Sequence, residues 1–504
     1  MSIIRQQSIR DSMVTYAGVA LGAVNVLFIY PACLQDEELG LFQFMVSWAM
    51  ILSPLVMLGT TNLVVRFFPV FRDEAQQHRG FLFLMLLLNA LGFVLFTLLV
   101  WLFQDAILDI LTQDHRSPLM RQYAIYIVPL TLFVSLNALF INYIKNFLRI
   151  VVPSFFENIF VKIATGTLAL LLFAGWVELS GFVRGIVVSY ALVTLGLIFY
   201  TRYLGQLYLR ADFSMLKRPL TREMAVFAYF GILGNASSGL MLYIDKAMLP
   251  LLIDKGGLDA SGIYTIVGFI GAAIDIPRKS LEKITTPVVA HSIQAGDWDN
   301  IRKLYSKSAI NQLIVGCLLL LGIWLNLDYF FDIMPNGEVY RPWKLVVLML
   351  GISSIIDMAT GINSQIISYS QYFRFNFYLA LILGLLNVLF NIIFIRFFQL
   401  NIYGTALATL TSITIYNLIK YTYIYRRLGM QPFSWATLGV LLLAMGIYII
   451  VVLVPPVGGH PVVDILIRSV LIVAMYVPAV LWLRLSPDFN LLWTQIWQKI
   501  RSRR

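Results

Sequence analysis

Long apolar runs, separated by short polar segments, follow one another along the whole 504-residue chain. A helix needs roughly 20 apolar residues to cross a hydrocarbon core of about 30 Å. Fourteen runs in this sequence reach that length, and we expect each to form a membrane-spanning helix. They lie near residues 12–31, 41–65, 81–103, 121–141, 152–174, 181–200, 226–253, 261–281, 309–327, 343–362, 377–396, 402–421, 436–454 and 463–483.

The composition agrees with this pattern. Hydrophobic residues make up 59% of the chain and charged residues 12%, whereas an ordinary soluble domain is about 45–50% apolar and about 25% charged. We therefore predict an all-α membrane protein. Cys33 and Cys317 are too few for a disulfide framework and are expected to act as packing residues.

The basic residues predict the orientation in the membrane. Most of the 37 lysines and arginines fall in alternate loops and at the two ends of the chain. Basic loops stay in the cytoplasm, and an even number of spans then places both termini there. The net charge of +11 is thus a topology signal rather than a nucleic-acid-binding surface. The tail "WTQIWQKIRSRR" is predicted to lie as a helix at the inner interface.

Two glycine pairs indicate an internal repeat. Gly40 in "DEELGLFQFM" and Gly262 in "LDASGIYTIV" each follow an acidic patch, and they are 222 residues apart. Gly181 and Gly404 open later spans and are 223 residues apart. Because six spans separate the members of each pair, the two repeats would have parallel orientation, as in some transporters. The predicted divisions are an N-terminal six-helix lobe (1–210), a C-terminal six-helix lobe (211–430), transmembrane helices 13 and 14 (431–484) and a basic interfacial tail (485–504).

The sequence contains no pattern typical of an enzyme. The four histidines lie far apart in polar segments, and zinc spacings, phosphate-binding loops and nucleophile elbows are missing. We therefore expect no enzymatic activity, no metal site and no cofactor beyond a coupling ion such as H⁺ or Na⁺. The histidines are His78, His115, His291 and His460.

Charges inside the membrane are costly, so they are the best candidates for function. The cations Arg66, Lys162 and Arg278 lie near predicted cytoplasmic span ends, where they would either snorkel to the interface or line a cavity. The neighbours Asp245 and Lys246 fall within the seventh span, where they would either hold helices together or contact substrate.

Two further acids are candidates for ion coupling or gating. Asp275 lies in "GAAIDIPRK" and has Arg278 and Lys279 close enough in sequence for local pairing. Asp357, in "SSIIDMATG", has no base nearby in the sequence. A buried carboxylate must be protonated, paired or hydrated, so Asp357 is the first candidate.

Several segments resemble the O-antigen-type oligosaccharide-lipid flippases, the polysaccharide-transporter branch of the multidrug/oligosaccharidyl-lipid/polysaccharide exporter superfamily. "LGTTNLVVRFF" resembles the second helix of that branch, whose arginine would be Arg66. "YIDKAMLPLLI" with "SGIYTIV" resembles its seventh-to-eighth helix junction. "TTPVVAHSIQAGDWDNIRKLYSKS" resembles its following inner loop, and "LNVLFNIIFIRFFQLNIYGTALAT" its eleventh-to-twelfth helix hairpin.

The resemblance implies that the protein moves an undecaprenyl-diphosphate-linked oligosaccharide from the inner to the outer leaflet of a bacterial inner membrane. Such a transporter would serve polysaccharide synthesis, for example of the O-antigen of lipopolysaccharide. Arg66, Lys162 and Arg278 would then attract the diphosphate at the inner mouth of a cavity between lobes that alternate in access. A monomer is compatible with this mechanism.

Three alternatives stay open at this point. A lipid II-type flippase would differ only in its cargo. A cation-coupled multidrug antiporter shares the superfamily, but its bacterial members resemble one another in a first-helix carboxylate, and Val14–Tyr30 contains none. A membrane glycan polymerase or ligase would be expected to carry a large outer loop, which the short loops here do not provide.

Overall fold

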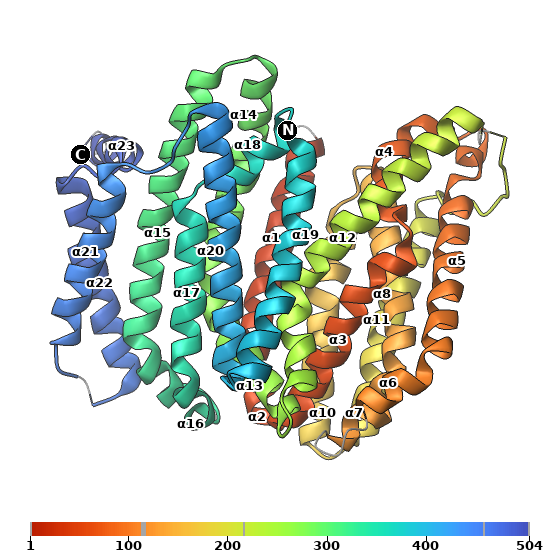
Figure 1. The fold of residues 1–504 in the computed structure, drawn as a ribbon, viewed down its shortest axis with the longest axis horizontal. Helices are drawn as coiled ribbons and strands as arrows, with labels where there is room; N and C mark the ends of the chain where they lie inside the picture. Colours follow the sequence, from red (N-terminus) through yellow and green to blue (C-terminus); the bar gives the residue numbers. More distant parts are fainter. Residues whose placement is uncertain (1–2, 112–116, 215–216, 457–458, 502–504) are drawn as a thin grey trace. The chain divides into compact units, whose positions relative to one another are not determined.

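The computed structural model describes residues 3–111, 117–214, 217–456 and 459–501. His115 and the last two arginines of the tail, Arg503 and Arg504, lie outside these ranges. Every regular element within them is helical, and fourteen of these helices are long and apolar enough to cross a membrane. The predicted all-α fold with about fourteen spans is therefore confirmed (Figure 1).

The contacts divide the chain into two compact units, Met1–Thr265 and Ile266–Arg504. The first contains α1 (Ile3–Val24), η1 (Asn25–Ile29), α2 (Tyr30–Cys33), α3 (Asp36–Met57), α4 (Thr60–Phe71), η2 (Gln77–Gly80), α5 (Phe81–Leu102), α6 (Gln104–Leu111), α7 (Pro118–Tyr123), η3 (Ala124–Tyr126), α8 (Ile127–Lys145), α9 (Val151–Phe155), η4 (Phe156–Phe160), α10 (Val161–Phe173), α11 (Leu179–Tyr203) and α12 (Arg218–Leu252). The boundary falls within α13 (Gly257–Ala272).

The second unit continues from the end of α13. It contains η5 (Ala273–Asp275), α14 (Ile276–Gln294), α15 (Trp298–Ile333), α16 (Gly337–Tyr340), η6 (Arg341–Trp343), α17 (Lys344–Ala359), α18 (Asn363–Tyr369), α19 (Phe373–Asn391), η7 (Ile392–Phe397), α20 (Asn401–Leu428), α21 (Trp435–Val452), α22 (Pro461–Trp482) and α23 (Pro487–Arg501). The lobe boundaries drawn from the sequence stay a prediction.

The predicted second span, near residues 41–65, forms two helical segments, α3 and α4, of which α3 is long and apolar enough to cross a membrane. They meet at Leu58 and Gly59, whose backbones are both left-handed, with φ of 45° and 77°. A Cβ on Gly59 would lie 2.6 Å from the carbonyl oxygen of Ala228, so only glycine fits both the turn and the close approach of α12. The break sets the direction of α4, which carries Arg66.

The glycines that indicated a repeat pack reciprocally within the first unit. A Cβ on Gly40 would overlap the carbonyl oxygen of Leu258, and a Cβ on Gly262 would overlap that of Asp36. Each of these partners lies four residues before the other glycine, so one contact is made twice in mirrored roles. Two copies of one helix related by a two-fold axis would pack in this way.

In the second unit, α15 packs against α17, α21 and α22 around a core of buried aliphatic side chains. The helices α21 and α22 lie side by side, and α23 follows the end of α22 (Figure 1). Two contacts hold α23 on α15: Lys307 Nζ and Asn311 Nδ2 donate to the Asp488 carboxylate over 3.0 and 2.9 Å.

Asp488 lies in α23, outside the membrane-spanning helices, and its surroundings change the pKa of its carboxyl group. Partial burial raises its pKa, but the hydrogen bonds from Asn311 and Lys307 and the charge of Lys307 outweigh that effect. The net result is a pKa below the ordinary value of an aspartate. The start of the tail helix is therefore fixed by a carboxylate that stays ionised.

Candidate functional site

Lys162 lies between two π-helical segments of the first unit, η1 and η4. Segments of this kind are frequent at functional sites because the extra residue redirects neighbouring side chains. Lys162 Nζ donates to the carbonyl oxygen of Gly18 over 2.8 Å, and Asn25 Nδ2 donates to the carbonyl oxygen of Lys162 over 2.7 Å. A Cβ on Gly22 would lie 3.1 Å from Lys162 Nζ, so glycine leaves room for the ammonium.

The charge of Lys162 is not compensated by an acid. Its ammonium makes no ion pair, and no hydrogen bond beyond that to Gly18, with any residue in the described ranges. Glu157, in the segment just before it, is 3.5 Å from Lys145 instead. A half-buried ammonium with only a carbonyl partner is suited to bind an anion.

Arg66 lies on α4 and faces the first part of α12. Its guanidinium donates to Glu223 over 2.8 Å, and its Cζ is 4.5 Å from the ring centroid of Phe227. About half of each charged side chain is exposed, so the pair contributes little stability. An anionic ligand can therefore replace Glu223 without leaving a buried charge unpaired.

Asp245 and Lys246 both make contacts with other helices. Tyr264 Oη donates to Asp245 over 2.8 Å, and Lys246 Nζ lies 3.4 Å from Gln43 Oε1. The indole of Trp48 donates to the carbonyl oxygen of Ala247 over 3.2 Å. These contacts hold α12 against α3 and α13, which favours the packing role over the substrate role for both residues.

Asp357 is paired with a base that is distant in the sequence, which is one of the three states expected for a buried carboxylate. Arg278 Nη1 is 3.3 Å from Asp357 Oδ2 and also donates to Glu282 over 2.5 Å. The same guanidinium donates to Asp275, in the local pairing that the sequence indicated, and Lys279 lies 3.5 Å from Asp275. The partner of Asp357 is far away in sequence because the contact joins α14 to α17.

Sequence reasoning missed Lys420 altogether. It lies at the end of an apolar run, where a lysine is expected to snorkel, but its side chain is 1% exposed. Its Nζ donates to Ser364 Oγ over 3.0 Å and lies 3.9 Å from the ring centroid of Tyr416. A buried ammonium held by a hydroxyl and an aromatic face is recognisable only from the packed helices.

Asn417 connects these groups from the same helix as Lys420. Its Nδ2 donates to Asp357 over 2.9 Å, while its Oδ1 accepts hydrogen bonds from Thr360 and Asn363 over 2.9 and 3.0 Å. We call the set of Asp275, Arg278, Glu282, Asp357, Asn417 and Lys420 the charge network. Its carboxylates and cations nearly balance, and neutralising one member alters the hydrogen bonds of the others.

The histidine, cysteine and acidic side chains do not assemble into a metal site in any described part of the chain. The three carboxylates of the charge network surround a guanidinium, which occupies the place that a cation would take.

Two solved structures of similar fold are a flippase and a multidrug-resistance transporter. A lipid II flippase, MurJ, in an inward closed conformation has a TM-score of 0.69 at 13% identity, covering 94% of this chain and 99% of its own. An inward-facing multidrug-resistance transporter of the MATE family, in the MOP superfamily, has a TM-score of 0.63 at 12% identity, covering 84% and 98%. A search of curated proteins gave no significant match.

At such identities these likenesses show the fold alone. They agree with the all-α fold of about fourteen spans expected from the sequence. A family described as polysaccharide biosynthesis proteins matches residues 6–276, more than half of the chain. This multi-pass membrane protein therefore belongs to the polysaccharide biosynthesis protein family.

Proposed function

We propose that the protein flips an undecaprenyl-diphosphate-linked oligosaccharide from the inner to the outer leaflet of a bacterial cytoplasmic membrane, with both termini in the cytoplasm. The observation that carries this proposal is the half-buried ammonium of Lys162, which has a carbonyl partner and no carboxylate. A diphosphate brings negative charge that hydrocarbon cannot solvate, and an uncompensated cation within the membrane supplies the counter-charge.

Arg66 is the second cation in this scheme. Its planar guanidinium suits two phosphate oxygens at once, and its present partner Glu223 is half exposed and easily released. Lys162 remains fixed by Gly18 while the ligand binds, so the site loses little side-chain entropy. Alternating access would carry the head group outward together with its oligosaccharide.

The charge network is the proposed coupling device. Arg278 was first considered for the diphosphate, but three carboxylates occupy its guanidinium, so we assign it to coupling. Protonation of Asp357, or binding of Na⁺ beside it, would weaken its contacts with Arg278 and Asn417. Because these groups lie on α14, α17 and α20, such a change biases how the three helices pack.

Two other cargoes have specific support. A lipid II-type flippase is favoured by the fold of the MurJ structure, and a cation-coupled multidrug antiporter by that of the MATE structure. Both flippase cargoes carry a diphosphate, so Lys162 suits either. A cationic drug would be repelled by the same ammonium, which ranks the antiporter last.

The test uses proteoliposomes that carry a fluorescent polyprenyl-diphosphate oligosaccharide. Accessibility to a membrane-impermeant quencher is followed with time, with labelled lipid II and ethidium as competing cargoes under the same ion gradients. We expect the oligosaccharide lipid to move and Lys162→Gln to slow it at least about tenfold, the loss typical of a charge-assisted contact. Lys217→Gln is the matched control, because Lys217 is exposed at the start of α12.

Movement of ethidium without the lipid would replace the flippase proposal by the antiporter. Movement of lipid II alone would keep the flippase and change its cargo. A Lys162→Gln rate equal to wild type would remove the electrostatic argument, whichever lipid moves.

A further inference from the structure

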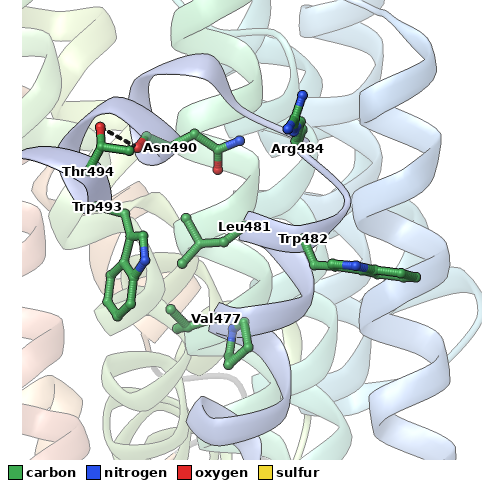
Figure 2. Close-up of a pocket in the computed structure, with 8 residues that line it drawn as sticks. Val477, Leu481, Trp482, Arg484, Asn490, Trp493 and Thr494 are labelled. Carbon is green, nitrogen blue, oxygen red and sulfur yellow. Dashed lines mark hydrogen bonds between the residues drawn. The ribbon is translucent and has the colours of Figure 1, made fainter. Parts of the chain in front are cut away.

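A pocket of about 650 Å³ lies where α22 meets the tail helix α23 (Figure 2). Its volume is within the range of about 300–1,000 Å³ that small-ligand sites occupy. Val477, Pro478 and Leu481 of α22 form an apolar wall, and Trp493 of α23 lies on the other side. The indole of Trp493 turns toward Val477 and Leu481, whereas Trp482 points away from them.

Polar groups line the rim of this pocket. Arg484 lies in the turn between the two helices, and its guanidinium makes no ion pair or hydrogen bond with any residue that the structure describes. The side-chain oxygen of Asn490 is buried without a partner. The hydroxyl of Thr494 donates to the carbonyl oxygen of Asn490 over 3.1 Å within α23 (Figure 2).

Asp488, the next acid along the chain, makes its ion pair with Lys307 rather than with Arg484. Asp488 is paired with Lys307 and Asn311 on α15, and Ser486 Oγ donates to Asn311 over 2.6 Å. These contacts position α23 rigidly, so the pocket does not depend on a free tail. Arg484 and Asn490 thus lie at the polar rim of a pocket with an apolar wall.

The ligand that combines these features is a phospholipid with a negative head group. Its phosphate oxygens can accept hydrogen bonds from the guanidinium of Arg484 and from the amide nitrogen of Asn490, and the first carbons of its glycerol and acyl chains suit Leu481 and Trp493. The end of the chain, "QKIRSRR", adds further basic residues in the sequence. Helices with aromatic and basic residues of this kind lie at membrane surfaces and are attracted to anionic lipids.

We infer that the pocket between α22 and α23 binds one anionic phospholipid, which ties the tail helix to the membrane surface. The site is separate from Lys162 and from the charge network, and its function does not depend on the cargo that is transported.

The experiment is native mass spectrometry of the purified full-length protein in detergent that contains equal amounts of phosphatidylglycerol and phosphatidylcholine. Wild type is expected to retain phosphatidylglycerol in preference. Arg484→Gln should lower that preference about fivefold, the effect expected for one basic side chain at an anionic membrane surface. Arg427→Gln is the matched control, because Arg427 is also exposed in the last turn of a span-forming helix but lies outside the pocket.

A second variant tests the apolar wall. Trp493→Ala should reduce the retention of both lipids and leave the preference between them unchanged. Equal preference in Arg484→Gln and wild type would overturn the inference, as would an equal loss in Arg427→Gln. Displacement of phosphatidylglycerol by inorganic phosphate would also overturn it, because the pocket would then be a site for free anions.

Discussion

Removing Arg278 tests whether the charge network holds the second unit together. Arg278→Gln keeps a polar side chain of similar length but leaves Asp275, Glu282 and Asp357 without their shared cation. The exposed fractions of these carboxylate side chains are 17%, 25% and 19%, so water cannot fully compensate them. We therefore expect a large loss of stability rather than the small one typical of surface pairs.

The magnitude follows from the geometry of one pair. At the 3.3 Å between Arg278 and Asp357, Coulomb's law gives about 5 kcal/mol at an effective dielectric constant of about 20. Breaking a buried ion pair by removing one partner costs about 3–5 kcal/mol in practice, because the remaining charge stays buried. The surface pair Lys344 and Asp328 is about half exposed, so Lys344→Gln should cost less than about 1 kcal/mol.

Stability in detergent would be compared for wild type, the two single variants and the double variant Arg278→Gln with Asp357→Asn. The double variant should recover part of the loss, because one of the three uncompensated charges is gone. The reasoning is refuted if Arg278→Gln costs no more than Lys344→Gln. It is also refuted if adding Asp357→Asn increases the loss, because Asp357 would then be stabilised by something other than Arg278.

Three further outcomes are expected. Gly40→Ala should lower the free energy of unfolding by about 1–3 kcal/mol, because the added methyl group overpacks the helix contact. Gly322→Ala is the control and should leave stability unchanged, because its Cβ would meet no atom within 4 Å. Equal melting curves for the two variants would refute the close packing at Gly40. Lys420→Met should weaken the dependence of flipping on the imposed ion gradient, and an unchanged dependence would separate the network from coupling. Because the pKa of Asp488 is lowered, its stabilising contribution should persist above the ordinary aspartate pKa of about 3.9 and be lost only as the pH falls through the lower folded value. Limited proteolysis of the tail by an acid protease would show release below about pH 4, and Asp488→Asn should abolish that step.

The architecture could be predicted because its signals are local or periodic. An apolar run of span length needs no partner to be recognised, and the hydrocarbon core allows it few conformations other than a helix. The pairing of Asp275 with Arg278 was equally visible, since residues three apart on a helix are neighbours. The glycine pair at Gly40 and Gly262 pointed to the repeat, although not to the reciprocal packing that explains the glycines.

Two features of the site could not be predicted from the sequence, namely the break between α3 and α4 and the π-helical segments beside Lys162. The break in the second span depends on consecutive left-handed residues, Leu58 and Gly59, and leucine gives no local sign of that conformation. The π-helical segments beside Lys162 likewise leave no pattern in an apolar sequence. Both features redirect the side chains that carry the proposed function.

The three cations considered for the diphosphate illustrate the general reason. Arg66, Lys162 and Arg278 all lie near predicted cytoplasmic span ends. In the fold, Arg66 shares its charge with one half-exposed acid, Lys162 has only a carbonyl, and Arg278 is enclosed by three carboxylates. A charged side chain is available to a ligand only to the extent that neighbouring groups do not already compensate its charge. Those neighbouring groups come from other helices. A sequence can therefore identify which charges are inside the membrane, but only the packing decides which of them is left for the substrate.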